Sequence, residues 1–211
     1  MSDSMSPDDR RARVAEMQAA AKRSERQRAV AIVAGIAAVA LVLVGWAALV
    51  IIDAAEDQGA VDAAAEGSID GVEEFDDLTN SHVTQPVDYP QTPSVGGDHA
   101  AVWLNCGVYN EPVDPMQTTH SLEHGAVWIG YDPAIESDQT ETLTQLAEAN
   151  EYVVLSPVEG VPSPVTASAW GYQLQLDSAD DPRLEVFIEK YQQSEQAPEP
   201  GAPCTDGAGG M

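Results

Sequence analysis

The chain has 211 residues, with 35 acidic and only nine basic side chains, which give a formal net charge of −26. The imbalance is greatest after residue 52, where 30 acidic residues stand against two basic ones. A surface of this sign repels nucleic acid and anionic lipid head groups, so neither is an expected partner of this part of the chain. It favours cations, soluble basic partners or simply solubility in a salty medium.

An apolar segment at 29–52 is the first element expected along the chain. It carries no charge, and as a helix it would span about 36 Å, which exceeds the roughly 30 Å of a hydrocarbon core. We therefore predict a single transmembrane helix in contact with the lipid bilayer. A cleaved secretory signal is the alternative, although the apolar region of such signals usually has about 7–15 residues.

Basic residues indicate the direction of this predicted helix. Seven of the nine Lys and Arg residues precede it, and basic flanks tend to stay on the cytoplasmic side. Residues 1–28 are therefore predicted to be a cytoplasmic basic segment of a single-pass cell-membrane protein, with the rest of the chain extracytoplasmic. Residues 53–80 hold many acidic residues and no basic one, which is typical of a tether rather than a core.

Both cysteines, Cys106 and Cys204, belong to the part predicted to lie outside. Two cysteines in an oxidising compartment most simply form one disulfide. Such a bridge would pin the Pro- and Gly-rich tail at 194–211 to the core and leave 81–193 as one folded domain. The alternative for Cys106 is a metal ligand or a redox thiol.

Strands and helices follow one another in mixed order between residues 100 and 191. By their β-branched and aromatic content, strands are predicted at 100–109, 126–131, 152–155 and 165–176. By capping residues and apolar spacing, helices are predicted at 115–124, 137–150 and 182–191. The pattern indicates an α+β fold: an N-terminal transmembrane helix followed by a small mixed sheet with helices packed on one side.

The histidines are the strongest candidates for chemistry. If residues 115–124 form a helix, Met116, His120 and His124 share one face at spacings of four residues. Imidazoles four residues apart can chelate one ion, and a thioether beside them shifts the preference toward copper. His99, at the start of the neighbouring predicted strand, would complete a copper or zinc site.

Two carboxylates lie beside these histidines in the sequence. Asp98 precedes His99 and Glu123 precedes His124, so either could orient an imidazole from outside the ligand shell. The site requires His99 to lie within about 8 Å of His120 or His124, because metal–nitrogen distances are about 2 Å. The alternative is structural: histidines that satisfy backbone groups and a methionine in the core.

Residues 120–124, HSLEH, also match the H-x-x-E-H signature of inverted zinc peptidases, in which both histidines hold zinc and the glutamate is the general base. Gly125 ends the predicted helix directly after the motif, and a domain of this size leaves little room for a third ligand and a cleft. A zinc hydrolase is therefore a remote alternative, and we expect a binding domain rather than an enzyme. The other alternative is an interaction or structural subunit of a membrane or envelope assembly, whose protein partner the sequence does not identify.

Five ordered motifs together carry a resemblance to a known family. They are LNCGVY at 104–109, HSLEHGAVW at 120–128, LSP at 155–157, ASAWG at 167–171 and PEPGAPC at 198–204. In these motifs the chain resembles the bacterial family catalogued as domain of unknown function 3105, over about His82 to Cys204. The resemblance implies an N-terminal anchor with an outer domain, and it makes His120, Glu123, His124, Cys106 and Cys204 family positions. It implies no activity.

Overall fold

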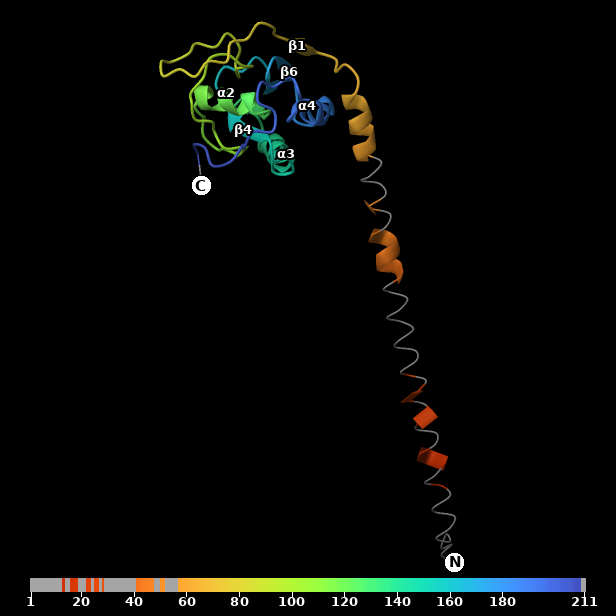
Figure 1. Ribbon diagram of the computed structural model, residues 1–211. Helices are drawn as coiled ribbons and strands as arrows, with labels where there is room; N and C mark the ends of the chain where they lie inside the picture. The colour runs from red at the N-terminus through yellow and green to blue at the C-terminus, as the bar shows by residue number, and fades with distance from the viewer. Residues whose placement is uncertain are drawn as a thin grey trace, which may run out of the picture. The chain divides into compact units, whose positions relative to one another are not determined.

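The computed structural model describes residues 13, 16–18, 22–23, 25–26, 28, 41–47, 50–51 and 57–209. The chain consists of two compact units, Met1–Asp57 and Gln58–Met211. The described residues of the first unit are helical, and the second unit contains the sheet, the helices packed on it and the candidate site (Figure 1).

The predicted transmembrane helix is corrected by the structure. Across the residues described, there is no helix that combines the length and the apolar character needed to cross a membrane. A span needs about 20 consecutive apolar residues, and the helical stretches described within 29–52 are 41–47 and 50–51. The remainder of that predicted helix, 29–40, 48–49 and 52, lies outside the described residues, as does most of the predicted cytoplasmic segment 1–28.

Six strands form one mixed sheet in the order β1-β6-β5-β3-β4-β2. Strands β2 and β3 run parallel to β4, and the other neighbours are antiparallel. The strands are β1 (Val72–Glu74), β2 (Gly107–Val108), β3 (Val127–Tyr131), β4 (Val153–Pro157), β5 (Val165–Ala169) and β6 (Tyr172–Leu176). The helices are α2 (Pro115–Glu123), α3 (Ser137–Glu148) and α4 (Arg183–Tyr191). The predicted α+β class with a mixed sheet is confirmed.

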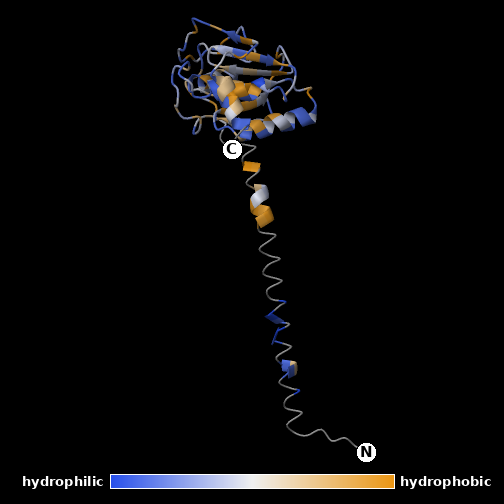
Figure 2. Ribbon diagram, turned by 90° about the vertical axis from the view of Figure 1, so that its right-hand side faces the viewer, coloured by the Kyte–Doolittle hydropathy of each residue, from blue (hydrophilic) through white to orange (hydrophobic). Residues whose placement is uncertain are grey.

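The main core lies on the face of the sheet that α3 and α4 cover. Ile129 of β3 and Leu155 of β4 point to this side, where they pack with Leu143 of α3 and with Leu184 and Phe187 of α4. Every residue of β3, β4 and β5 is buried, as expected for strands covered on both faces. Figure 2 shows the apolar residues gathered in the interior of this unit.

The opposite face of the sheet is covered as well, so the expectation of helices on one side only is wrong. Trp128 and Val154 alternate with the core residues of β3 and β4 and point the other way. There they pack with Leu122 of α2 and with Leu104 and Trp170. In Figure 1, β4 accordingly lies between α2 and α3.

Two predicted strands are shorter than expected. The predicted strand 165–176 is a hairpin of β5 and β6, which turns at Gly171 with a φ of 79° that favours glycine. In the predicted strand 100–109 only Gly107–Val108 pairs with the sheet, through β4. Helix α2 begins at Pro115 as predicted, and His124 is its C-cap.

The segment predicted to be a tether, 53–80, contains the edge strand β1. Val72 pairs with Leu174 of β6, and the second compact unit already begins at Gln58. The two basic residues of this unit bind the backbone of the same segment. Arg183 Nη1 donates to the Asp70 carbonyl and Lys190 Nζ to the Ala65 carbonyl, each at 3.0 Å.

The predicted disulfide between Cys106 and Cys204 is confirmed, with the two Cα atoms 5.3 Å apart. The tail follows the segment that precedes β2: the Cys106 amide donates to the Cys204 carbonyl at 2.8 Å, and Leu104 forms a bridge with Ala208. The bridge therefore holds the C-terminal tail against the domain, as the sequence indicated.

Gly130 in the centre of β3 offers a test of this packing. A Cβ atom built there would lie 2.5 Å from Pro93 Cγ and 3.0 Å from Val158 Cγ2. We expect Gly130→Ala to lower the free energy of unfolding by about 1–3 kcal/mol, since overpacking a close-packed site forces its neighbours to move. Urea unfolding measures this. Gly59→Ala is the control, because that helical position has nothing within 4 Å, and equal effects of the two substitutions would contradict the close approach.

Candidate metal centre

Helix α2 supplies two of the side chains in the site. Asp114 caps its first turn by accepting a hydrogen bond from the Met116 amide at 2.9 Å, and Pro115 takes the first helical position, where no amide donor is needed. His120 and Glu123 lie near the other end, three residues apart, and therefore point to the same side. Both are buried, with 4% and 2% of their surface exposed.

Two extended segments bring the other histidines to this helix. His82 and His99 form an isolated parallel bridge, in which the Val83 amide donates to the His99 carbonyl at 2.8 Å and the His99 amide to the Ser81 carbonyl at 3.0 Å. The ring centroids lie 5.0 Å apart for His82 and His99, 4.7 Å for His82 and His120, and 4.8 Å for His99 and His120. The predicted proximity of His99 and His120 is thus confirmed.

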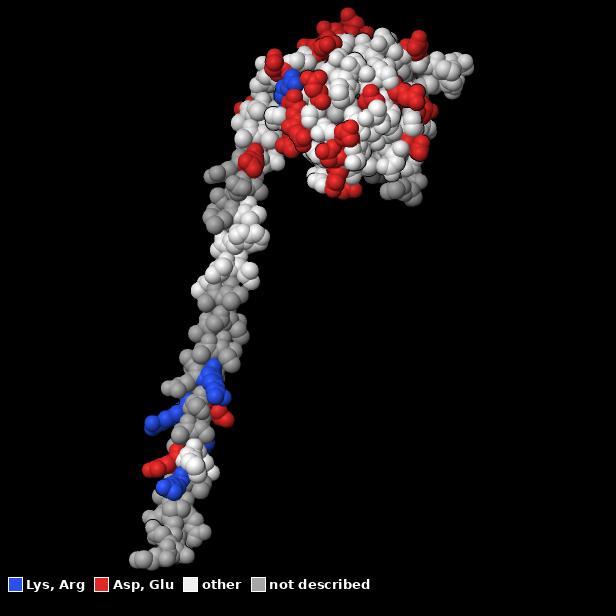
Figure 3. Space-filling model, turned by 180° about the vertical axis from the view of Figure 1, so that it is seen from behind, with Lys and Arg blue, Asp and Glu red and all other residues white. Residues whose placement is uncertain are grey.

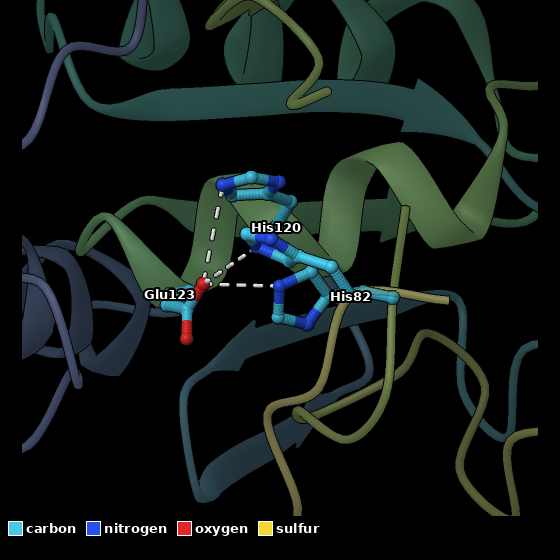
Figure 4. Close-up of side chains that lie close together, drawn as sticks. His82, His120 and Glu123 are labelled. Atoms are coloured by element: carbon cyan, nitrogen blue, oxygen red, sulfur yellow. Dashed lines mark ion pairs between the residues drawn. The ribbon is translucent and has the colours of Figure 1, made fainter. Parts of the chain in front are cut away.

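One oxygen of Glu123 approaches all three rings. Its Oε2 atom is 3.0 Å from Nε2 of His99, 3.7 Å from Nε2 of His82 and 3.9 Å from Nε2 of His120 (Figure 4). One ligand atom from each of the four residues lies within 4.8 Å of the other three. Ligands about 2.1 Å from a tetrahedral zinc ion are separated by roughly 3.4 Å, so a contraction of at most about 1.4 Å in these separations would let all four atoms bind one ion.

Backbone carbonyls define which nitrogen of each buried ring faces the cluster. His99 Nδ1 lies 2.8 Å from the Gly97 carbonyl, and His120 Nδ1 lies 2.7 Å from the Ala100 carbonyl. A carbonyl only accepts, so Nδ1 carries the proton in both rings and a neutral ring presents the Nε2 lone pair to the cluster. Metal-bound histidines are commonly oriented in this way by a carbonyl on the other nitrogen.

His120 is held in the neutral form that a metal requires. Its pKa is lowered from 6.5 to about 4, mainly because burial disfavours the charged ring. The Ala100 carbonyl opposes this shift, while the neighbouring rings of His124, His99 and His82 add to it. His120 therefore carries no proton on Nε2 at neutral pH.

His99 Nε2 is a buried polar atom without a hydrogen-bond partner among the described residues. Glu123 Oε2 approaches it to 3.0 Å, within ion-pair distance but without the orientation of a hydrogen bond. Two electron-rich atoms in a dry site repel each other unless a proton or a cation lies between them. Native structures leave few buried polar atoms unsatisfied, so this pair requires an explanation.

His124, which the sequence placed in the metal site, lies outside the cluster. Its Nδ1 lies 2.7 Å from the Pro203 carbonyl, and its Nε2 is 3.8 Å from Glu199 Oε2. The helix ends at Glu123, so His124 turns toward the C-terminal tail. The His124 ring centroid lies 4.6 Å from that of His120, but His124 is not among the four residues whose ligand atoms cluster. The glutamate of the H-x-x-E-H pattern lies among the potential ligands instead of beside them.

For Met116, the hydrogen bonds found in the described part of the chain both involve its backbone, and its role as a thioether ligand stays a prediction. Asp98 differs from its predicted role of orienting an imidazole. Asp98 Oδ1 accepts from the Ser81 amide at 3.1 Å, next to His82, so it supports the loop rather than a ring. Hydrogen bonds from the Thr79 hydroxyl and the Ser81 amide lower the pKa of Asp98.

Sequence reasoning missed two members of the cluster in their observed roles. His82 stands 17 residues before His99 in an irregular segment, with no helical or strand periodicity to connect them. The one signal for His82 was the count of histidines: the chain has four, and the other three were already candidate ligands. Glu123 was expected to orient a ring from outside the shell, but its position three residues after His120 places it in the cluster itself.

The comparisons with known proteins agree with the resemblance seen in the motifs. A family model described as Protein of unknown function (DUF3105) matches residues 82–206, from the first histidine of the cluster to just beyond Cys204. No curated protein and no solved structure matches the chain. Since the matched region covers more than half of the sequence, the chain belongs to the DUF3105 family.

Proposed function

We propose that the domain binds one divalent transition-metal ion through Nε2 of His82, His99 and His120 and a carboxylate oxygen of Glu123. The observation that carries the proposal is the pair of His99 Nε2 and Glu123 Oε2, buried and 3.0 Å apart without a hydrogen bond. An ion between them would turn a repulsive contact into two coordination bonds. The other two imidazoles already face the same point.

The donor set favours zinc or copper(II). Three imidazole nitrogens and one carboxylate oxygen suit borderline ions, whereas magnesium and calcium prefer oxygen ligands alone. Both cysteines are in the disulfide, so neither offers the thiolate that would favour copper(I). Zinc and copper(II) are therefore the ions to test first.

The charge of the domain supports the approach of a cation. Acidic side chains are spread over the face seen in Figure 3, with few basic ones among them. A negative field of this kind raises the local concentration of cations and their rate of association. Because it is screened by salt, it would affect the rate of binding more than the strength of the coordination bonds.

We also propose that the domain works outside the cytoplasm. The Cys106–Cys204 disulfide supports this, because structural disulfides form and persist in oxidising compartments. An ion bound there would reach the site from the medium rather than from cytoplasmic carriers.

The test is a metal titration of the full-length protein after treatment with a chelator. We expect one zinc or copper(II) ion per chain by calorimetry and elemental analysis. Bound metal should raise the free energy of unfolding by about 2.7 kcal/mol when its free concentration is about 100 times Kd. Excess magnesium should not compete, since it takes oxygen ligands.

The double variant His99→Asn/His120→Asn is the matched comparison. Asparagine keeps an N–H donor near the position of Nδ1, for the carbonyls of Gly97 and Ala100, and removes Nε2. Circular dichroism would verify that the variant is folded. The proposal fails if the wild type shows no saturable site, or if the double variant binds the ion as tightly as the wild type.

A further inference from the structure

The four residues of the cluster are unequally buried. The side chains of His99, His120 and Glu123 are 0%, 5% and 3% exposed, whereas that of His82 is 49% exposed. An ion at the centre would therefore be enclosed by three residues and would meet the solvent on the side of His82. Exchange of the ion, or of any ligand on it, has to pass this ring.

The same four residues are unequally fixed in position. His99 and His120 are each held by a hydrogen bond from Nδ1 to a backbone carbonyl, and Glu123 lies on helix α2. For the His82 ring, the described residues provide ring contacts and the 3.7 Å approach to Glu123, but no hydrogen bond. Orienting hydrogen bonds hold a metal ligand in place, and His82 lacks one.

We infer that His82 is an exchangeable ligand, which can leave the ion and open one coordination position to a small external donor with a nitrogen or oxygen atom. This inference rests on the proposed metal site. His99, His120 and Glu123 then form the permanent set, two imidazoles and one carboxylate. Three protein ligands with a fourth position left for water or an external molecule distinguish reactive metal sites from closed structural ones.

The external ligand would be small and polar. The position vacated by His82 lies at the surface, next to the ring of His120, where a planar nitrogen heterocycle such as imidazole would retain the stacking that His82 makes with that ring. Imidazole is also the side chain of His82 itself, and it therefore provides a direct probe of the vacated position.

The experiment loads the full-length protein with cobalt(II), whose visible spectrum reports its coordination. We expect His82→Ala to keep one cobalt ion per chain with affinity lowered by less than about tenfold, whereas His99→Asn lowers it by about 100-fold or more. Imidazole added to the His82→Ala protein should restore a spectrum like that of the wild type. It should have little effect on the wild type at the same concentration.

Each outcome bears on a different claim. If the wild type binds no cobalt, or if neither variant weakens binding, the metal site itself is refuted. If the wild type binds but His82→Ala loses the ion as completely as His99→Asn, or imidazole leaves the variant spectrum unchanged, the exchangeable role of His82 is refuted while the metal site stands.

Discussion

Reduction of the Cys106–Cys204 disulfide is expected to lower the free energy of unfolding by about 4–5 kcal/mol. The bridge joins residues 98 positions apart, and a cross-link over such a long loop removes much of the conformational freedom of the unfolded chain. In the folded state the tail also makes contacts that depend on its position beside Cys204, including the Pro203 carbonyl near His124 Nδ1. Urea unfolding of the metal-free protein, with and without a phosphine reductant, measures the difference.

The double variant Cys106→Ala/Cys204→Ala is the control for this experiment. It should unfold at the same lowered urea concentration in both buffers, because it has no bridge to reduce. The folded variant should still bind the metal ion within about tenfold of the wild-type affinity, since the tail's hydrogen bonds beside the site go to the His124 ring and to the Glu123 backbone carbonyl rather than to the four ligand side chains. A loss of less than about 1 kcal/mol on reduction would contradict the stabilising role of the bridge.

Local patterns predicted the elements of the domain well where one signal dominated. Asp114 and Pro115 marked the start of α2, and the apolar run around Trp128 marked β3. The prediction that helices cover only one face of the sheet was wrong. Strands buried on both faces show no alternation of apolar and polar residues, so their sequence does not tell which elements cover each face. Strand β1 was missed because it is short, polar and at the edge of the sheet, where its side chains are too exposed to show an apolar pattern.

In the site, too, contacts between residues close in the sequence could be predicted, whereas those that depend on distant segments could not. The approach of His120 and Glu123 follows from helical spacing, and the approach of His99 was expected from its place before a strand. The position of His82 depends on a backbone bridge to His99, 17 residues later in the chain. No helical or strand periodicity in the sequence predicts this bridge. The exclusion of His124 depends on where α2 ends and on the tail that binds its ring, and both are properties of the folded chain.

His120→Asn is expected to weaken the binding of zinc or copper(II) by about 100-fold or more, whereas His124→Asn should change it by less than about threefold. The two positions are one helical turn apart and similarly buried, at 4% and 3% exposure. Each Nδ1 lies 2.7 Å from a backbone carbonyl, of Ala100 or of Pro203. Asparagine can keep that contact in both variants, so their main difference is whether the lost Nε2 faces the cluster.

A competition titration against a chelator of known affinity measures both variants in the same buffer. Urea unfolding of the metal-free proteins should give similar stabilities, because each substitution removes a similar volume and keeps a similar hydrogen bond. Equal losses of affinity would show that the ion lies between His120 and His124, as the helical spacing in the sequence suggested. A loss confined to His124→Asn would refute the cluster around Glu123, whereas a loss confined to His120→Asn places the ion on the side of α2 that faces His82 and His99.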